Sequence, residues 1–184
     1  IREFPLREWR ARIGLVLQDI SLFPGTVEEN VRALASDITA HQVNEALRVA
    51  GADRLVARLP EGMHTALAEG GKNLSLGERQ LLSIARAVVR DPEVLILDEA
   101  TSSVDAATET RLQESMDRAF WGRTVVIVAH RLSTLRNVDK ILVIHEGRLA
   151  EEGCHPELYA RDGVYRRLHD LQFARGGRPW AANE

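Results

Sequence analysis

Two short apolar runs on either side of a predicted helix constrain the fold more than any other feature of this sequence. Val94–Leu97 and Thr124–Ala129 have the length of strands, and Ala106–Ala119 between them predicts a helix. Continuous apolar runs are typical of buried parallel strands. Ile13–Leu17 is a third run of this kind. Strands that alternate with helices predict an α/β fold with a mostly parallel sheet.

An all-helical insertion is expected between the first strand and the second. Capping boxes and Gly or Pro stops predict its helices, and Asp91-Pro92 ends the last of them. After the third strand we expect a hairpin around Glu146-Gly147 and one helix over His155–Phe173. The expected organisation is one partial domain over 1–173, with a helical subdomain at about 26–91, a second part at 92–173 and a flexible tail at 174–184. The predicted helices of the insertion are Val27–Leu34, Thr39–Gly51, Ala52–Arg58 and a long helix from Ser75.

Composition excludes several classes of protein. Hydrophobic residues make up 45% and charged residues 28%, which is the balance of a globular chain. The formal net charge is −3, so a general affinity for nucleic acid is not expected. No apolar run has the length of a membrane span, so any membrane connection is expected through another segment or subunit.

Polar side chains follow each of the three predicted strands. Asp98-Glu99 ends one strand, and Gln18 and His130 follow the others. Open α/β sheets bind ligands at this edge, where one carboxylate can hold Mg²⁺ through water and the next can polarise an attacking water. For Asp98-Glu99 alone, the alternative is that the pair merely ends the strand and starts a helix.

The long helix begins with a second chemical signal. Ser75 and Glu78 form a capping box, and Gly77 leaves the first turn without a side chain. An uncovered helix N-terminus with a serine hydroxyl and free backbone N–H groups suits a phosphate. The alternative is simply a well-started helix.

Five segments together resemble the motifs of the ATP-binding-cassette (ABC) ATPases, and they occur in the family's order. NLSLGERQ resembles the signature, VLILDE the Walker B motif with the catalytic glutamate, and SSVD the D-loop. AHR resembles the switch histidine and LQD the Q-loop. The resemblance implies a P-loop NTPase-like domain with an inserted helical subdomain.

The resemblance also implies roles for single residues, with ATP and Mg²⁺ as cofactors. Glu99 would act on the attacking water and His130 would contact the γ-phosphate. Gln18 and Asp98 would serve Mg²⁺, Asp98 through water. The remaining residues would serve an ATP sandwiched between two cassettes, Ser75, Gly77 and Glu78 through the signature and Ser103 and Asp105 along the interface.

The sequence departs from the family pattern at two places. No segment matches the phosphate-binding loop GxxGxGK[ST], so we expect an N-terminally truncated cassette that is inactive alone. The signature has Leu76 where glycine is usual and Glu78 where glutamine is usual. Such sequences resemble one half of heterodimeric multidrug or lipid exporters, so a weakened partner site and a heterodimer are favoured.

The segment QDISLFPGTVEENV resembles exporters, which implies a transmembrane domain as partner and a location at the cytoplasmic face of the membrane. We expect its loop to expose Leu22 and Phe23 for that domain, although ordinary loop packing is an equal alternative on the residues alone. Two other readings stay open: a soluble ABC ATPase of DNA repair or translation, and a non-catalytic regulatory cassette.

Overall fold

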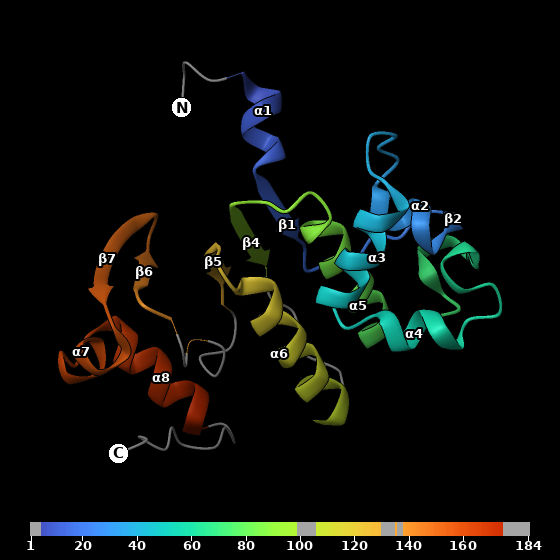
Figure 1. Cartoon of the computed structure of the whole chain (residues 1–184). Helices are drawn as coiled ribbons and strands as arrows, with labels where there is room; N and C mark the ends of the chain where they lie inside the picture. The colour runs from blue at the N-terminus through green and yellow to red at the C-terminus, as the bar shows by residue number, and fades with distance from the viewer. Residues whose placement is uncertain (1–4, 99–105, 130–134, 136–137, 175–184) are drawn as a thin grey trace. The chain divides into compact units, whose positions relative to one another are not determined.

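The structure is a computed structural model that describes residues 5–98, 106–129, 135 and 138–174. It divides into two compact units, Ile1–Val128 and Ala129–Glu184. Figure 1 shows the elements of both units. Among the described residues, no helix has both the length and the apolar character needed to cross a membrane.

A parallel sheet organises the first unit. Its strands are β1 (Ile13–Val16), β4 (Val94–Asp98) and β5 (Thr124–Val128), in the order β1-β4-β5. Both strand pairs are parallel, which confirms the predicted α/β class. The carboxyl ends of the strands therefore meet at one edge of the sheet.

The two faces of this sheet differ in burial. Gly14, Val16, Leu95 and Leu97 alternate toward a buried face, and no side chain fits at Gly14 because a Cβ there would lie 2.4 Å from the Ala87 carbonyl oxygen. On the other face Leu15 is 49% exposed and Val126 47% exposed. The apolar runs predict buried strands, and this expectation is wrong for one face of β1 and for β5, whereas every residue of β4 is buried or partly buried. Among the described elements, α5 packs on the Gly14 face.

The helical layer follows the predicted capping signals. Three helices begin with a capping box, at Thr26, Thr39 and Ser75. In each box the side chain of the first residue accepts the backbone N–H of the residue three positions later, and the side chain of that residue accepts the backbone N–H of the first. Such caps satisfy N–H groups that the helix itself leaves open. The helices are α2 (Val27–Arg32), α3 (Ala40–Val49), α4 (Asp53–Arg58), α5 (Leu76–Val88) and α6 (Ala106–Phe120).

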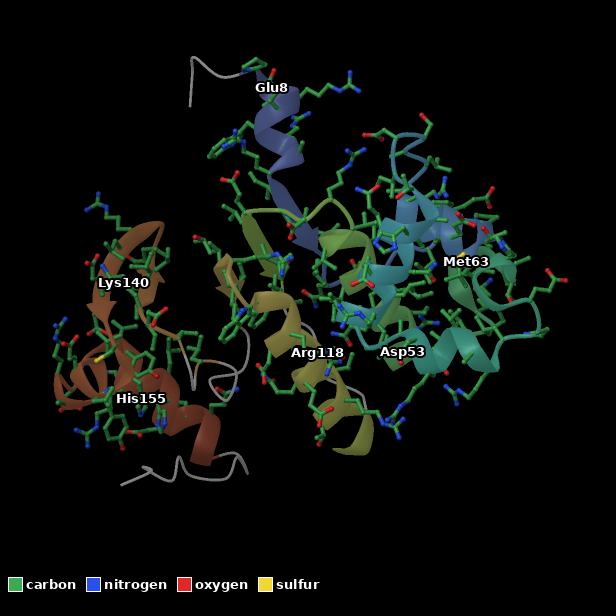
Figure 2. All side chains as sticks on the ribbon, in the orientation of Figure 1. Glu8, Asp53, Met63, Arg118, Lys140 and His155 are labelled. Carbon is green, nitrogen blue, oxygen red and sulfur yellow. The ribbon has the colours of Figure 1, made fainter. Side chains whose placement is uncertain are left out.

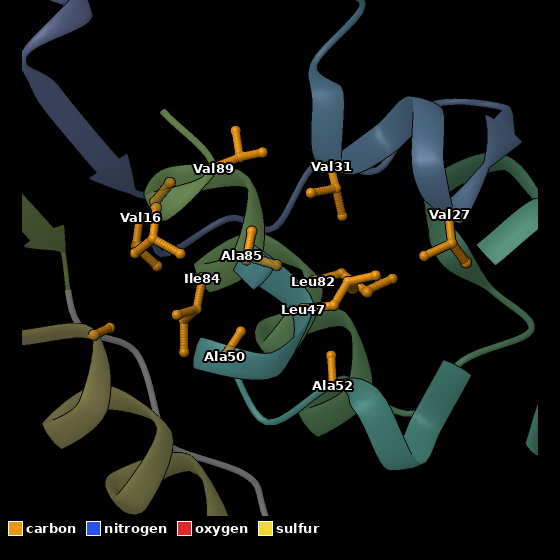
Figure 3. Close-up of a cluster of buried hydrophobic side chains, with 14 of the residues drawn as sticks. Val16, Val27, Val31, Leu47, Ala50, Ala52, Leu82, Ile84, Ala85 and Val89 are labelled. Carbon is orange, nitrogen blue, oxygen red and sulfur yellow. The ribbon is translucent and has the colours of Figure 1, made fainter. Parts of the chain in front are cut away.

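One hydrophobic core joins these helices to the sheet. Leu82, Ile84 and Ala85 of α5 lie at its centre, between Leu47 on α3 and Val16 on β1 (Figure 3). Leu82, Ile84 and Ala85 are each at most 2% exposed. The helix that begins at the signature is therefore fixed along its length by packing.

Several short elements carry no clear sequence signal. Two-residue strands cannot show a period, and the first helix begins after Pro5 without a side-chain cap. The 3₁₀ turns are similarly short. These elements are α1 (Leu6–Ala11), the antiparallel pair β2 (Gly25–Thr26) and β3 (Ala66–Leu67), η1 (Gly62–His64) and η2 (Glu69–Gly71).

The second unit contains the predicted hairpin, β6 (Ile141–His145) with β7 (Arg148–Gly153). The single helix predicted after it is wrong, because the chain forms α7 (His155–Ala160) and α8 (Val164–Ala174) with Asp162 at φ 55° between them. The Glu151 carboxylate accepts the backbone N–H groups of Val164 and Tyr165, at 3.1 and 2.8 Å. This contact from β7 starts a new helix where the sequence pattern continued the old one.

Candidate nucleotide site

The carboxyl edge of the sheet carries the first group of predicted site residues. Asp98 is the last residue of β4 and is partly exposed. Val16, the last residue of β1, pairs with Leu97, so the exposed Gln18 follows β1 at the same edge as Asp98. Both side chains offer oxygen atoms, the donors that Mg²⁺ prefers, and a partly exposed carboxylate suits a metal that keeps several waters. The two residues thus fit the expected ion.

Four other predicted site residues lie outside the described part of the chain. They are Glu99, Ser103, Asp105 and His130. Their roles stay predictions.

The first turn of α5 brings together the residues of the second group. Ser75 is exposed, and its Oγ accepts the Glu78 N–H at 3.3 Å. Glu78 Oε2 in return accepts both the backbone N–H and the hydroxyl of Ser75, each at 2.9 Å. Gly77 between them is buried. The predicted capping box is confirmed, and it presents an exposed serine at a helix N-terminus.

Glu78 has another partner that the sequence does not reveal. Arg58, the last residue of α4, donates from Nη2 to Glu78 Oε1 at 2.9 Å. Burial raises the pKa of Glu78, but hydrogen bonds from Ser75 and the charge of Arg58 outweigh it, so the pKa lies below its usual value. The carboxylate is therefore ionised at neutral pH. No local pattern connects residues 58 and 78.

A cavity of about 480 Å³ adjoins this turn, between α4, α5 and α6. Figure 2 labels Asp53 and Arg118, which line it from α4 and α6. Arg118 donates only to neutral acceptors among the described residues, the Val49 carbonyl at 3.2 Å and the Ser115 hydroxyl at 3.1 Å. Five arginines line the cavity, Arg48, Arg54, Arg58, Arg111 and Arg118, together with three carboxylates, Asp53, Glu78 and Glu114. The lining therefore carries more positive than negative charge beside Ser75, in a chain whose net charge is −3.

Comparison with known proteins decides the family. The family model described as "ABC transporter" matches residues 2–102, more than half of the chain. The chain belongs to the ABC transporter family. The identification rests on a stretch that contains Gln18, the α5 turn and Asp98.

Named relatives of this ABC transporter chain cover nearly all of it. An ATP-dependent lipid A-core flippase of Chromobacterium violaceum is 43% identical over 95% of the chain, which spans 30% of that protein. A probable multidrug resistance ABC transporter ATP-binding/permease protein of Bacillus subtilis is 46% identical over 90% of the chain, which spans 25% of that protein. The chain thus spans less than a third of these relatives.

A solved structure supports the fold of the ABC transporter chain. The structure of a bacterial Atm1-family ABC exporter with ATP bound matches with a TM-score of 0.80 and 38% identity. The match covers 96% of this chain and 30% of the other. The mixed α/β architecture of the chain is therefore that of an ABC ATPase domain.

In this ABC transporter chain, the loop after Gln18 is packed rather than exposed. Leu22 is 3% exposed and belongs to the core, and Phe23 is partly buried with the Arg86 guanidinium 5.3 Å from its ring centre. The expectation that the loop exposes both side chains is wrong for Leu22, and Phe23 is only partly exposed. Asn30 of α2 is buried and holds the Phe23 backbone from both sides, accepting its N–H and donating to its carbonyl.

Proposed function

We propose that the chain is the ATP-hydrolysing part of an ABC exporter, working with ATP and Mg²⁺ at the cytoplasmic face of a membrane. The single observation that carries the proposal is the position of Asp98 at the carboxyl edge of the parallel sheet, in a chain that belongs to the ABC transporter family. Relatives named as a lipid A-core flippase and a multidrug resistance protein support the exporter over a soluble ATPase. Any sequence that precedes residue 1 would test this. Six membrane spans there would support an exporter, whereas their absence would support a soluble ATPase.

Each residue at the sheet edge has one task in this proposal. Asp98 and Gln18 hold Mg²⁺, Asp98 through water, and the ion offsets charge on the transferred phosphoryl group. Glu99 polarises the attacking water as a general base. His130 contacts the γ-phosphate and stabilises charge in the transition state.

The first turn of α5 serves a second cassette in this proposal. Ser75, Gly77 and Glu78 meet the phosphates of the nucleotide that the opposite cassette holds, and Ser103 and Asp105 lie along the interface. The exposed hydroxyl of Ser75 and the positive cavity beside it support anion recognition here. A transmembrane domain is the second partner, as expected for a protein related to ATP-binding/permease chains.

Replacing the proposed general base tests the function directly. In a polypeptide that joins this chain to a phosphate-binding loop, Glu99→Gln should lower ATP hydrolysis by about 10²-fold or more while ATP binding persists. Phosphate release and nucleotide binding would be measured on the same samples. Glu93→Gln is the matched control, because the Glu93 side chain is 68% exposed before β4 and lies away from the sheet edge. Equal activity of Glu99→Gln and wild type would exclude the role.

The 184 residues alone should neither bind ATP tightly nor hydrolyse it, because they contain no segment of the GxxGxGK[ST] type. Calorimetric titration would test this. Micromolar affinity for ATP would contradict it.

The unusual signature predicts a weakened partner site. Leu76 adds bulk and Glu78 adds negative charge where the family approaches phosphate. The double change Leu76→Gly with Glu78→Gln in the complete transporter should therefore raise ATP turnover severalfold. Leu81→Met, a near-isosteric change further along α5, is the control. Unchanged turnover would contradict the hypothesis that this cassette belongs to a heterodimer with two unequal ATP sites.

A further inference from the structure

Glu78 divides its two carboxylate oxygens between two neighbours. Oε2 accepts both hydrogen bonds from Ser75, and Oε1 accepts the Arg58 guanidinium at 2.9 Å. Arg58 is aimed at this point by its own helix, since its Nε donates to the Arg54 carbonyl at 3.3 Å. One carboxylate thus links the end of α4 to the first turn of α5.

The hydroxyl of Ser75 is already committed. A serine hydroxyl has one proton to donate. In the structure that proton points to Glu78 Oε2, 2.9 Å away, while Oγ accepts the Glu78 N–H. A phosphate oxygen that takes this proton replaces the carboxylate as the acceptor of the Ser75 hydroxyl.

A displaced carboxylate would be costly without a second partner. It would lose the hydrogen bond from the Ser75 hydroxyl and present a negative charge beside the phosphate. Arg58 lessens both effects, because it keeps one hydrogen bond on Oε1 and offsets part of the charge. The Glu78 side chain is only 27% exposed, so water does little of this work.

We propose that Arg58 is a positioning residue of the phosphate-recognising turn, which holds Glu78 in place and neutralises it while Ser75 exchanges the carboxylate for a phosphate oxygen. The inference rests on the proposed function in taking Ser75 to bind phosphate. It adds a residue on α4 that acts through Glu78. It also explains how a signature with glutamate in place of glutamine can still face an anion.

The chain offers a matched control. Arg54 lies one turn earlier on α4 and lines the same cavity, but it forms no ion pair among the described residues. Arg54→Gln therefore removes the same charge from the same cavity without touching Glu78. A general loss of positive potential would act through both arginines, whereas positioning would act through Arg58 alone.

The experiment is a double-mutant cycle on the 184-residue chain with inorganic tripolyphosphate as the probe. Backbone amide NMR shifts of Gly77 and Glu78 would give the affinity, and urea unfolding would verify that each variant is folded. We expect Arg58→Gln to weaken binding about two- to fivefold, the range of an exposed ion pair. We expect Arg54→Gln to change it less, and Arg58→Gln made in a Glu78→Gln background to match Arg54→Gln.

Two results would overturn the inference. Equal losses of affinity from Arg58→Gln and Arg54→Gln would mean that the removed positive charge, and not positioning, explains the effect. An unchanged effect of Arg58→Gln in the Glu78→Gln background would mean that Arg58 does not act through Glu78. Neither result affects phosphate binding by the wild type, so each would overturn the inference without contradicting the proposed function. A wild type that binds no tripolyphosphate at α5 would contradict the proposed role of Ser75, and the inference would fail with it.

Discussion

Arg86 carries a positive charge into a partly buried position where its hydrogen-bond partners are neutral. It donates to the Ser21 carbonyl at 2.7 Å, the Asn30 carbonyl at 2.8 Å and Asn30 Oδ1 at 2.9 Å. Its guanidinium fork thus ties α5 to the loop after Gln18 and to α2. A planar fork can make these contacts together, and an ammonium group cannot.

Arg86→Lys should therefore lower the free energy of unfolding by about 2 kcal/mol, since acceptors around Asn30 lose their donors. Urea unfolding of the chain would measure the change. Arg90→Lys is the control, because Arg90 pairs with the exposed Asp37 and such surface pairs contribute at most about 1 kcal/mol. Equal losses from the two variants would contradict the special place of Arg86.

At the scale of elements, the close approach of α5 to β1 depends on a missing side chain. A Cβ at Gly14 would lie 2.4 Å from the Ala87 carbonyl oxygen and 2.9 Å from atoms of Leu95 and Pro92. The Ala87 carbonyl belongs to the backbone and cannot move aside as a flexible side chain can. The contact between helix and sheet thus requires glycine.

Gly14→Ala should cost about 1–3 kcal/mol of unfolding free energy, the usual range for overpacking a tight core. Thermal or urea unfolding would measure it. Leu15→Ala, at the next residue on the half-exposed face, should cost less. A neutral Gly14→Ala would mean that α5 can move away from β1 freely.

The packing of α7 against α8 makes the second unit sensitive to acid. His155 contacts the Tyr165 hydroxyl at 2.7 Å, and burial together with the charge of His169 holds the pKa of His155 below its usual 6.5. The unfolded chain therefore takes up this proton at a higher pH than the folded chain does. The stability that neutral His155 contributes is fully present above pH 6.5, and it is lost as the pH falls through the lowered pKa of His155 in the folded chain.

Unfolding free energies measured between pH 7.5 and about 5 should accordingly decrease toward acid. His155→Phe should flatten this slope in the second unit, because phenylalanine has no proton to gain. A slope that persists in full would assign it to other groups.

Local signals account for the elements that the sequence predicts well. The capping boxes at Thr26, Thr39 and Ser75 lie within three residues of their partners, and Glu146-Gly147 contains its own turn. The predicted terminal helix and the missed partner of Glu78 depend instead on residues further away along the chain. Glu151 breaks the predicted terminal helix from 13 residues away, and Arg58 reaches Glu78 across 20 residues.

The same division applies to the candidate site. The order of strands and helices predicts that Gln18 and Asp98 share a sheet edge, because parallel strands end together. Leu22 instead lies in the hydrophobic core, and its carbonyl accepts the Gly70 N–H at 3.1 Å, a contact that no local pattern predicts. Sequence order therefore predicts which strand ends lie together, whereas further contacts such as that of Arg58 with Glu78 come from the tertiary structure.

On the scale of the whole molecule, α5 is the element through which the first unit holds together. It packs against α2, α3, α6 and β1, so the helical layer and the sheet share it. Neither layer can separate while this helix stays in place. The backbone amides of Leu82, Ile84 and Ala85 should then exchange their hydrogens with solvent only when the entire unit opens, and they would report its slowest and rarest fluctuation.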